Sequence, residues 1–104
     1  MGAHIMIRDI NRWTPLHHSA FGGCAFSTRV LLDHHSTQPM KAKDEDGNTP
    51  LHIAAECGHV NIVKMMLSRG ADISVVNKQK KTCLDVAIES GKEKVAEVFI
   101  GNQK

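Results

Sequence analysis

One short motif recurs three times in this chain of 104 residues, and its spacing constrains the fold more than any other feature. The tetrapeptide TPLH begins at Thr14 and again at Thr49, and a degraded copy, TCLD, begins at Thr82. Self-similarity at a fixed period of about 20 to 50 residues indicates a repeat architecture. In such folds one unit cannot bury its own apolar face, and the stacking of successive units creates the core.

Each copy of the motif predicts two helices. Threonine is a favourable N-cap, and proline fits the first helical position because its missing N–H is not needed there. A glycine stands nine residues after each threonine, at Gly23, Gly58 and Gly91. A glycine in the left-handed region ends a helix, so the first helix of each unit is short. Apolar residues at helical spacing then follow, as in residues 60–67, and predict a second helix.

The turn that precedes each motif differs among the copies. Asp46-Gly47 suits a tight hairpin turn ahead of the second copy. Arg12 and Lys80 occupy the corresponding places in the other copies, so those two tips lack the residue best suited to positive φ. The connection at residues 34–43 is two residues longer than its counterpart and is expected to bulge.

The unit resembles the ankyrin repeat, above all in the stretch DEDGNTPLHIAAECGHVNIVKMMLSRGADI at residues 44–73. The resemblance covers residues 9–100 and implies an all-α solenoid of about three helix-turn-helix repeats joined by hairpin loops. The predicted boundaries are 1–6 for a tag remnant, 7–43 for the first repeat with its two-residue insertion, 44–76 for the second and 77–104 for a degenerate third. The residues of the structural motif are Thr14, Pro15, Leu16, His17, Gly23, Gly47, Thr49, Pro50, Leu51, His52, Gly58 and Gly91.

Two imidazoles and a thiol lie close together in the second copy, at His52, Cys57 and His59. On one helix His52 and Cys57 point about 140° apart, whereas a metal pair needs a spacing of three or four residues. The resemblance implies instead that the motif histidine, here His17 and His52, hydrogen-bonds across neighbouring turns. The doubled histidines at 17–18 and 34–35 are adjacent in sequence and do not face one another on a helix, so they are interpreted as motif or surface positions.

Composition and motifs exclude several classes of function. The net charge is only +2 and aromatic residues make up 4%, which argues against a nucleic-acid partner. No apolar run approaches the length of about 20 residues that crosses a bilayer. No phosphate-binding loop, nucleophile elbow or acid–base carboxylate pair is present, so the prediction is a protein that is no enzyme and has no cofactor or metal. Three widely spaced cysteines favour a reducing, cytosolic setting.

Cys83 is the candidate reactive thiol. It replaces the motif proline at the start of a helix and follows Lys80 and Lys81. A helix N-terminus and nearby cations both lower the pKa of a thiol, so Cys83 is predicted to react fastest of the three cysteines. The alternative is that Cys83 fills a packing site.

The hairpin tips and the inner face of the first helices are the expected partner surface, from the geometry of ankyrin arrays. The predicted partner-binding residues are Asn11, Trp13, Phe21, Glu45, Asn48, Glu56, Lys78, Lys81 and Glu89. Lys78, Lys80 and Lys81, with Lys41 and Lys43 one repeat earlier, also form a possible basic ledge that would bind an anion weakly; the alternative is a solubilising surface.

Several less general features carry a narrower resemblance. WTPLHH at residues 13–18, DEDGNTPLH at 44–52, ADI at 71–73 and NKQ at 77–79 follow one another in an order similar to the membrane-proximal ankyrin repeats of the ankyrin-type (TRPA) transient receptor potential cation channels. The resemblance implies a calcium-permeable, homotetrameric parent channel in the plasma membrane. This segment would be a soluble part of its cytosolic N-terminal region, with a structural, gating-coupling or protein-interaction role. None of the three cysteines matches the electrophile-sensing cysteines of that family.

The alternative class is a soluble scaffold or signalling protein whose array binds a partner protein. The sequence names neither the partner nor the stimulus. Asp44 and Asp46 belong to the acidic turn that the resemblance matches and are interpreted as turn formers. Ile10, Trp13 and Phe21 give the first repeat an apolar rather than a polar outer face, so self-association through the ends is expected at high concentration.

Overall fold

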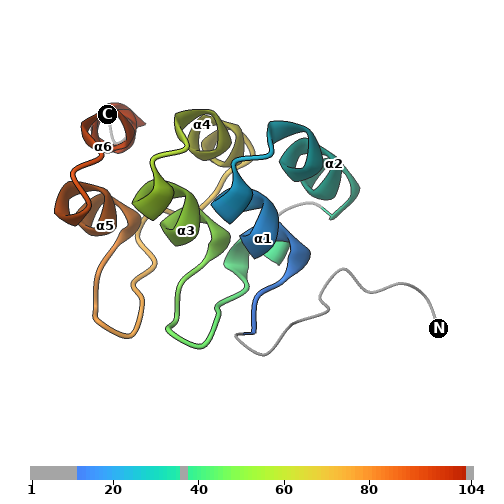
Figure 1. The fold of residues 1–104 in the computed structure, drawn as a ribbon, viewed down its shortest axis with the longest axis horizontal. Coiled ribbons are helices and arrows are strands. Elements are labelled where there is room, and N and C mark those ends of the chain that lie inside the picture. The colour runs from blue at the N-terminus through green and yellow to red at the C-terminus, as the bar shows by residue number, and fades with distance from the viewer. Residues whose placement is uncertain (1–11, 36–37, 103–104) are drawn as a thin grey trace.

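The computed structural model describes residues 12–35 and 38–102, and all of the regular elements there are helical. The elements are α1 (Pro15–Gly22), α2 (Ala25–His35), the 3-10 helix η1 (Gln38–Lys41), α3 (Pro50–Cys57), α4 (Val60–Ser68), α5 (Cys83–Glu89) and α6 (Glu93–Asn102). They form three antiparallel pairs that stack side by side, and the body measures 42 × 26 × 21 Å (Figure 1). The fold is therefore the all-α repeat stack that the sequence predicts.

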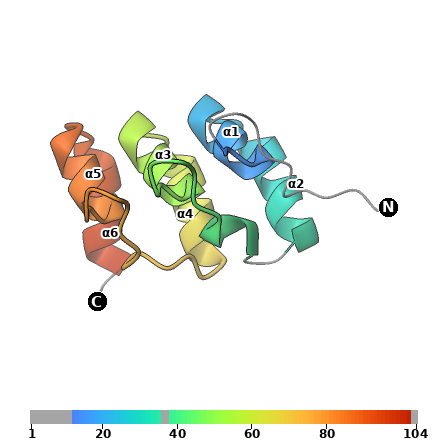
Figure 2. The ribbon, with the colours of Figure 1, turned by 90° about the horizontal axis from the view of Figure 1, so that it is seen from below.

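The stack has two helical layers. α1, α3 and α5 form the inner layer, and α2, α4 and α6 form the outer layer (Figure 1). The loops before α3 and α5 project from the inner layer on the same side, and the view from below confirms that the pairs follow one another in chain order (Figure 2). Each inner helix packs on its own outer helix, and α3 packs between α1 and α5.

The motif threonines start the inner helices by the same local chemistry. Thr14, Thr49 and Thr82 have extended backbones, and the hydroxyl of each accepts a hydrogen bond from the N–H three residues later. The residue at that third position returns a side-chain bond to the N–H of the threonine, which completes a capping box. In the third repeat the returning group is the carboxylate of Asp85, so the departure from histidine leaves the cap intact.

The core runs through all three pairs. It contains Leu16, Ala20, Leu32, Met40, Leu51, Ile53, Ala54, Ala55, Ile62, Val63, Met66, Cys83, Ala87, Val95, Ala96 and Phe99. Small residues at the centres of the inner helices allow close approach: Ala20, Ala54 and Ala55 are each 0% exposed. Burial of this continuous apolar surface supplies the main favourable term for folding.

Backbone strain is present at two loop tips. Arg12 and Lys80 both have φ of 64°, the left-handed region that non-glycine residues rarely adopt. Gly47 has φ of 79°, and a Cβ there would lie 2.8 Å from the backbone nitrogen of Lys78. Glycine is therefore required at the second tip for two reasons: the backbone has a positive φ, and the next loop leaves no room for a Cβ.

The longer first connection contains an element that the sequence did not predict. Within residues 38–41 the chain forms the 3-10 helix η1, and Met40 from it is 5% exposed in the core. The added length is thus partly used to bury a side chain against α2 and α3, which η1 contacts.

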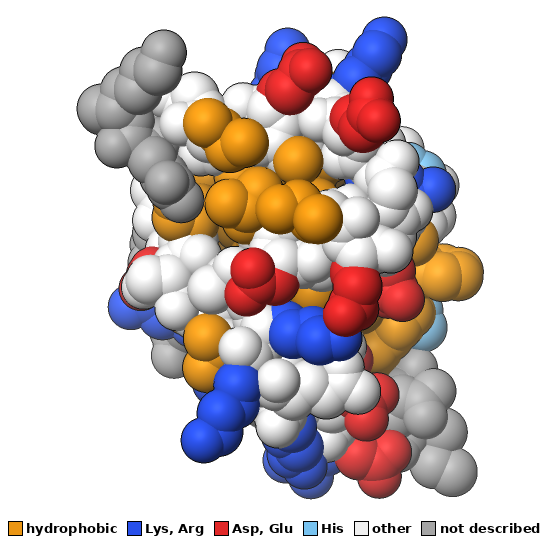
Figure 3. Space-filling view, turned by 90° about the vertical axis from the view of Figure 1, so that its left-hand side faces the viewer, with side chains coloured by type: hydrophobic (Ala, Val, Ile, Leu, Met, Phe, Trp, Pro, Cys, Tyr) orange, Lys and Arg blue, Asp and Glu red, His pale blue; other side chains and the backbone are white. Residues whose placement is uncertain are grey.

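The end of the stack formed by α5 and α6 is uncovered. Ile88 is 61% exposed and Ile100 is 53% exposed, whereas Ala55, the counterpart of Ile88 in the second repeat, is 0% exposed. Figure 3 shows a band of hydrophobic side chains across this end, between acidic and basic groups. Within the described part of the chain, no helix combines the length and the apolar character required to span a membrane.

Candidate functional site

The projecting loops are built around one buried polar residue each. Asp44 is 7% exposed, and its Oδ1 accepts the N–H groups of Asp46 and Asn48 at 2.9 and 2.8 Å. Asn77, its counterpart 33 residues later, is 9% exposed, and its Oδ1 accepts the N–H groups of Gln79 and Lys81. These bonds fix the shape of each tip from within.

The same two residues join neighbouring repeats. Trp13 donates its indole N–H to Oδ2 of Asp44 at 2.8 Å, and Asn77 donates its side-chain N–H to Oδ1 of Asn48 at 2.9 Å. Asp44 is therefore more than the turn former that the sequence suggests. A third lateral bond runs from the N–H of Lys78 to the carbonyl oxygen of Asp46 at 3.0 Å.

The motif histidines make the hydrogen bonds between repeats that the family resemblance implies. Nε2 of His17 lies 2.9 Å from the carbonyl oxygen of Asn48, and Nε2 of His52 lies 3.0 Å from that of Lys81. Nδ1 of His52 accepts the N–H of Thr49, so the proton resides on Nε2, which donates to the carbonyl. Burial of the ring lowers the pKa of His52, with a smaller opposing effect from its bond to Lys81.

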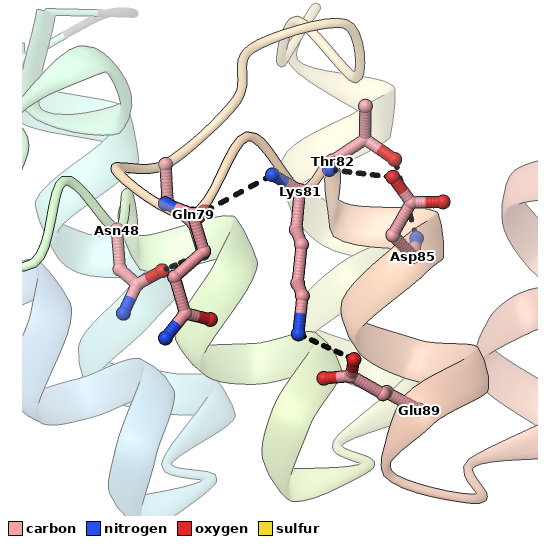
Figure 4. Close-up of polar contacts among 7 residues, drawn as sticks. Asn48, Gln79, Lys81, Thr82, Asp85 and Glu89 are labelled. Atoms are coloured by element: carbon pink, nitrogen blue, oxygen red, sulfur yellow. Dashed lines mark hydrogen bonds and ion pairs between the residues drawn. The ribbon is translucent and has the colours of Figure 1, made fainter.

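A groove lies between the projecting loops and the inner helices, and it contains two hollows. The first hollow lies beside Trp13 and Asp44, and the second lies one repeat later. The second hollow, of about 310 Å³, lies between the loops and the α3/α5 face. It is lined by Asp46, Asn48, Glu56, Asn77, Lys78, Gln79, Lys81, Val86, Glu89 and Ser90. Figure 4 shows the side chains of Asn48 and Gln79 pointing into it from the loops, while Lys81 reaches along it to form an ion pair with Glu89.

The first hollow, of about 290 Å³, lies one repeat earlier in the groove. It is lined by Trp13, Asp44, Glu45, Asp46, Asn48, Ile53 and Glu56. No lysine, arginine or histidine is among these lining residues. The two hollows share Asp46, Asn48 and Glu56, so they adjoin each other along the loops.

Most of the predicted partner-binding residues lie at this groove. Trp13, Glu45, Asn48 and Glu56 line the first hollow, and Lys78, Lys81 and Glu89 line the second. Phe21 is 56% exposed, with its ring centroid 5.4 Å from that of Trp13. Asn11 lies outside the described residues. The sequence analysis did not place Asp46 or Gln79 among the partner-binding residues, although both lie in the same loops beside residues that it did name.

The cysteines are ordered differently from the sequence prediction, and the prediction for Cys83 is wrong. Its thiol is 0% exposed in the core, and burial raises its pKa to about 12. Cys57 is half-buried, and burial, then the charge of Glu56, raises its pKa. Cys24 is exposed, and its hydrogen bond to Ser27 lowers its pKa.

The other histidines and cysteines of the second repeat do not converge. His59 directs Nε2 to the carbonyl oxygen of Phe21 at 3.0 Å, away from His52 and its bond to Lys81. Within residues 12–35 and 38–102, no three His, Cys, Asp or Glu side chains come together in a way that could hold a metal ion. His34 is exposed near the end of α2.

Stacked helical pairs, capped by threonine and joined through their loops, define a helical repeat protein. The family model described as ankyrin repeats in three copies matches residues 1–77. The chain belongs to the ankyrin-repeat family. Its last pair, α5 and α6, lies beyond that match, and the degraded motif TCLD begins at Thr82 just before α5. Ankyrin repeats are non-catalytic modules that mediate protein–protein interaction.

Three relatives show the range of proteins that contain such a segment. The chain is 41% identical over 91 residues to a transient receptor potential cation channel subfamily A member 1 homolog of Caenorhabditis elegans, covering 88% of this chain and 7% of that protein. It is 36% identical over 86 residues to the human NAD-capped RNA hydrolase NUDT12, covering 83% and 18%. It is 33% identical over 101 residues to the human SH3 and multiple ankyrin repeat domains protein 2, covering 96% and 5%. The chain thus spans a small part of each relative.

Proposed function

We propose that this chain is a segment of the cytosolic N-terminal region of a calcium-permeable TRPA-type cation channel. The observation that carries the proposal is the identity of 41% with the Caenorhabditis elegans subfamily A channel homolog across 88% of the chain. The order of the motifs WTPLHH, DEDGNTPLH, ADI and NKQ supports the same family. The parent would be a homotetramer, with this segment on the cytoplasmic side of the plasma membrane.

The segment would act as a connecting element in gating. Each neighbouring pair of repeats is joined by apolar packing and by several hydrogen bonds, among them His17 to Asn48 and His52 to Lys81. Protein interiors are close-packed and transmit strain, so displacement of one repeat is passed to the next rather than absorbed. The rest of the channel, or a cytosolic protein bound in the groove, would supply or receive that displacement.

Ionic currents recorded from the full-length parent channel test this proposal. Replacing His52 and Asn77 by leucine removes two bonds between the second and third repeats, and Lys64→Gln, on the exposed side of α4, is the matched control. We expect the double variant to shift the midpoint of activation at unchanged surface expression, and the control to leave it unchanged. The proposal fails if the double variant reaches the surface and gates as the wild type does.

A soluble scaffold or signalling protein is the second candidate function. The human SH3 and multiple ankyrin repeat domains protein 2 favours it, since the similarity covers 96% of this chain. The natural sequence that follows the chain separates the candidates. A channel requires several apolar spans of about 20 residues there, and a scaffold does not.

Anion binding at Lys78, Lys80 and Lys81 remains a prediction. Lys81 forms an ion pair with Glu89, and Lys78 shares its hollow with three carboxylates, so only Lys80 stands apart from the groove. A titration with inositol hexakisphosphate at low salt would decide it. A flat response would remove the anion site.

A further inference from the structure

We propose that the first hollow of the groove binds an arginine side chain of an extended partner segment. The inference rests on the proposed function in one respect, that it takes the groove as the surface for a partner protein. It goes further by naming the chemistry of that partner. Three features carry it: the aromatic wall of the hollow, its unbalanced charge and the amide at its junction with the second hollow.

The aromatic wall is held in a fixed position. Trp13 is anchored by its indole N–H, which donates to the buried carboxylate of Asp44 at 2.8 Å. Its ring also packs against His18 at a centroid distance of 4.9 Å and against Phe21 at 5.4 Å. Phe21 is 56% exposed at a position where the later repeats carry Glu56 and Glu89. Trp13 itself is half-buried, and the part of this aromatic pair that remains accessible offers a flat apolar surface on which a guanidinium can stack.

The charge of the first hollow is unbalanced. Glu45, Asp46 and Glu56 present exposed carboxylates there, and none of the described residues that line it is cationic. Among the described residues, ion pairs join Arg69 to Asp33 and Lys81 to Glu89, and neither pair involves these carboxylates. The second hollow differs, because Lys78 and Lys81 offset its acids. We therefore expect a cation in the first hollow, because no described lining residue offsets its negative charge.

Asn48 gives the partner segment a polar contact between the two hollows. Its Oδ1 accepts from Asn77, and its side-chain amino group points into the groove (Figure 4). A primary amide in this position can donate to a peptide carbonyl of an extended chain. The next part of the segment would then lie in the second hollow beside Gln79 and Lys78.

Arginine is favoured over lysine by the form of the hollow. A planar guanidinium can stack on the Trp13 ring and donate two parallel N–H groups to one carboxylate. An ammonium is a point charge that is more strongly hydrated, so its desolvation costs more. Asp44 already accepts three N–H groups, so its role is to position Trp13, and contact with the guanidinium falls to Glu45 and Glu56.

The single tryptophan of the chain makes the test direct, because all indole fluorescence comes from Trp13, which lines the first hollow. The probes are an acetylated and amidated pentapeptide with arginine between glycines, and the same peptide with citrulline, which keeps the shape and loses the charge. We expect the arginine peptide to change Trp13 emission at millimolar concentration and at low salt, with about tenfold weaker binding by citrulline. A lysine peptide should fall between them.

Matched variants localise the effect. Glu45→Gln and Glu56→Gln should each weaken arginine-peptide binding by roughly fivefold. Glu93→Gln makes the same charge change on α6, outside both hollows, and should leave binding unchanged. Equal binding of the citrulline peptide, no response to the arginine peptide, or an equal loss in Glu93→Gln would each overturn the inference.

These results are independent of the gating test. If His52 and Asn77 variants alter the parent channel while arginine does not bind, the arginine site is wrong and the proposed function stands. If arginine binds as described while gating is unaffected, the site stands and the channel role is wrong.

Discussion

Trp13 and Asp44 lie 31 residues apart in the chain, and the hydrogen bond between them repeats, in reverse, one unit later. Trp13 corresponds to Asn48, and Asp44 corresponds to Asn77. At the first interface the earlier residue donates, from the Trp13 indole to the Asp44 carboxylate. At the second interface the later residue donates, from the Asn77 amide to the Asn48 amide oxygen. The stack therefore preserves the position of the bond while the chemistry of its partners changes.

Asp44→Ala should destabilise the fold by about 2 kcal/mol, because it leaves the indole of Trp13 and the N–H groups of Asp46 and Asn48 without their acceptor. Urea unfolding followed by circular dichroism measures the change, and Trp13 emission should report a freed indole. Glu45→Ala is the matched control. Its side chain is exposed, and the expected change is within about 0.5 kcal/mol. Equal effects of the two substitutions would contradict the role of Asp44.

Acid should weaken the fold through His52. Burial lowers the pKa of His52 in the folded state, so the unfolded chain binds this proton more readily than the folded chain. The contribution of His52 to stability is therefore fully present above the pKa of the unfolded residue, about 6.5, and is lost as pH falls below that value toward the lower folded pKa.

The free energy of unfolding, measured by urea between neutral pH and pH about 5, tests this sign. His52→Gln should cost about 1 to 2 kcal/mol at neutral pH through weakened bonds to Thr49 and Lys81. The variant should also lose stability less steeply than the wild type as pH falls, since glutamine does not titrate. Parallel pH profiles of the two proteins would show that His52 is not the titrating group.

Lys80→Gly should stabilise the fold by roughly 1 kcal/mol. Lys80 has a φ of 64°, a left-handed conformation in which a Cβ crowds the backbone, and glycine has no Cβ. Gly47→Ala at the corresponding tip should do the opposite, since the new Cβ would meet Lys78 nitrogen at 2.8 Å and φ there is 79°. Thermal melts of both variants beside the wild type measure the two shifts. Shifts of the same sign would refute the strain at residue 80.

The helices and their caps could be read from the sequence because they depend on local chemistry. Thr14 and Gly23 set the limits of α1 within a few residues of chain, and the same spacing repeats for α3. The histidine bonds were also accessible, since the family resemblance implied them. Repetition helped in each case, because one copy of the motif could be compared with another.

The role of Asp44 and the burial of Cys83 could not be read in this way. Local sequence places Cys83 beside two lysines at a helix start, but the direction of its side chain is decided by how α5 packs on α3. Likewise, the contact between Asp44 and Trp13 exists only after the two repeats have stacked. Both properties depend on contacts between units, which the sequence of one unit does not contain.

Self-association through the uncovered end should fall when that end is made polar. Ile88 and Ile100 are more than half exposed, whereas Ala55, the counterpart of Ile88 in the second repeat, is 0% exposed. The double variant Ile88→Lys and Ile100→Lys should remain monomeric at millimolar concentration, while the wild type shows a rising weight-average mass in sedimentation equilibrium. The control is Lys64→Gln, on the exposed side of α4 in the second repeat. A wild type that stays monomeric at that concentration would refute the expectation of association.

The three thiols should react with a maleimide in the order Cys24, Cys57, Cys83. Cys24 is exposed and the pKa of its thiol is lowered by the bond to Ser27, so more of it is thiolate at neutral pH. Cys83 is enclosed in the core, and a pKa of about 12 leaves almost no thiolate. Brief labelling followed by peptide mapping gives the order, and Cys24→Ser should remove the fast phase.

Labelling in urea should make Cys83 as reactive as the others, because unfolding removes its burial. If Cys83 were labelled first in the folded protein, the packing of α5 on α3 described here would be wrong.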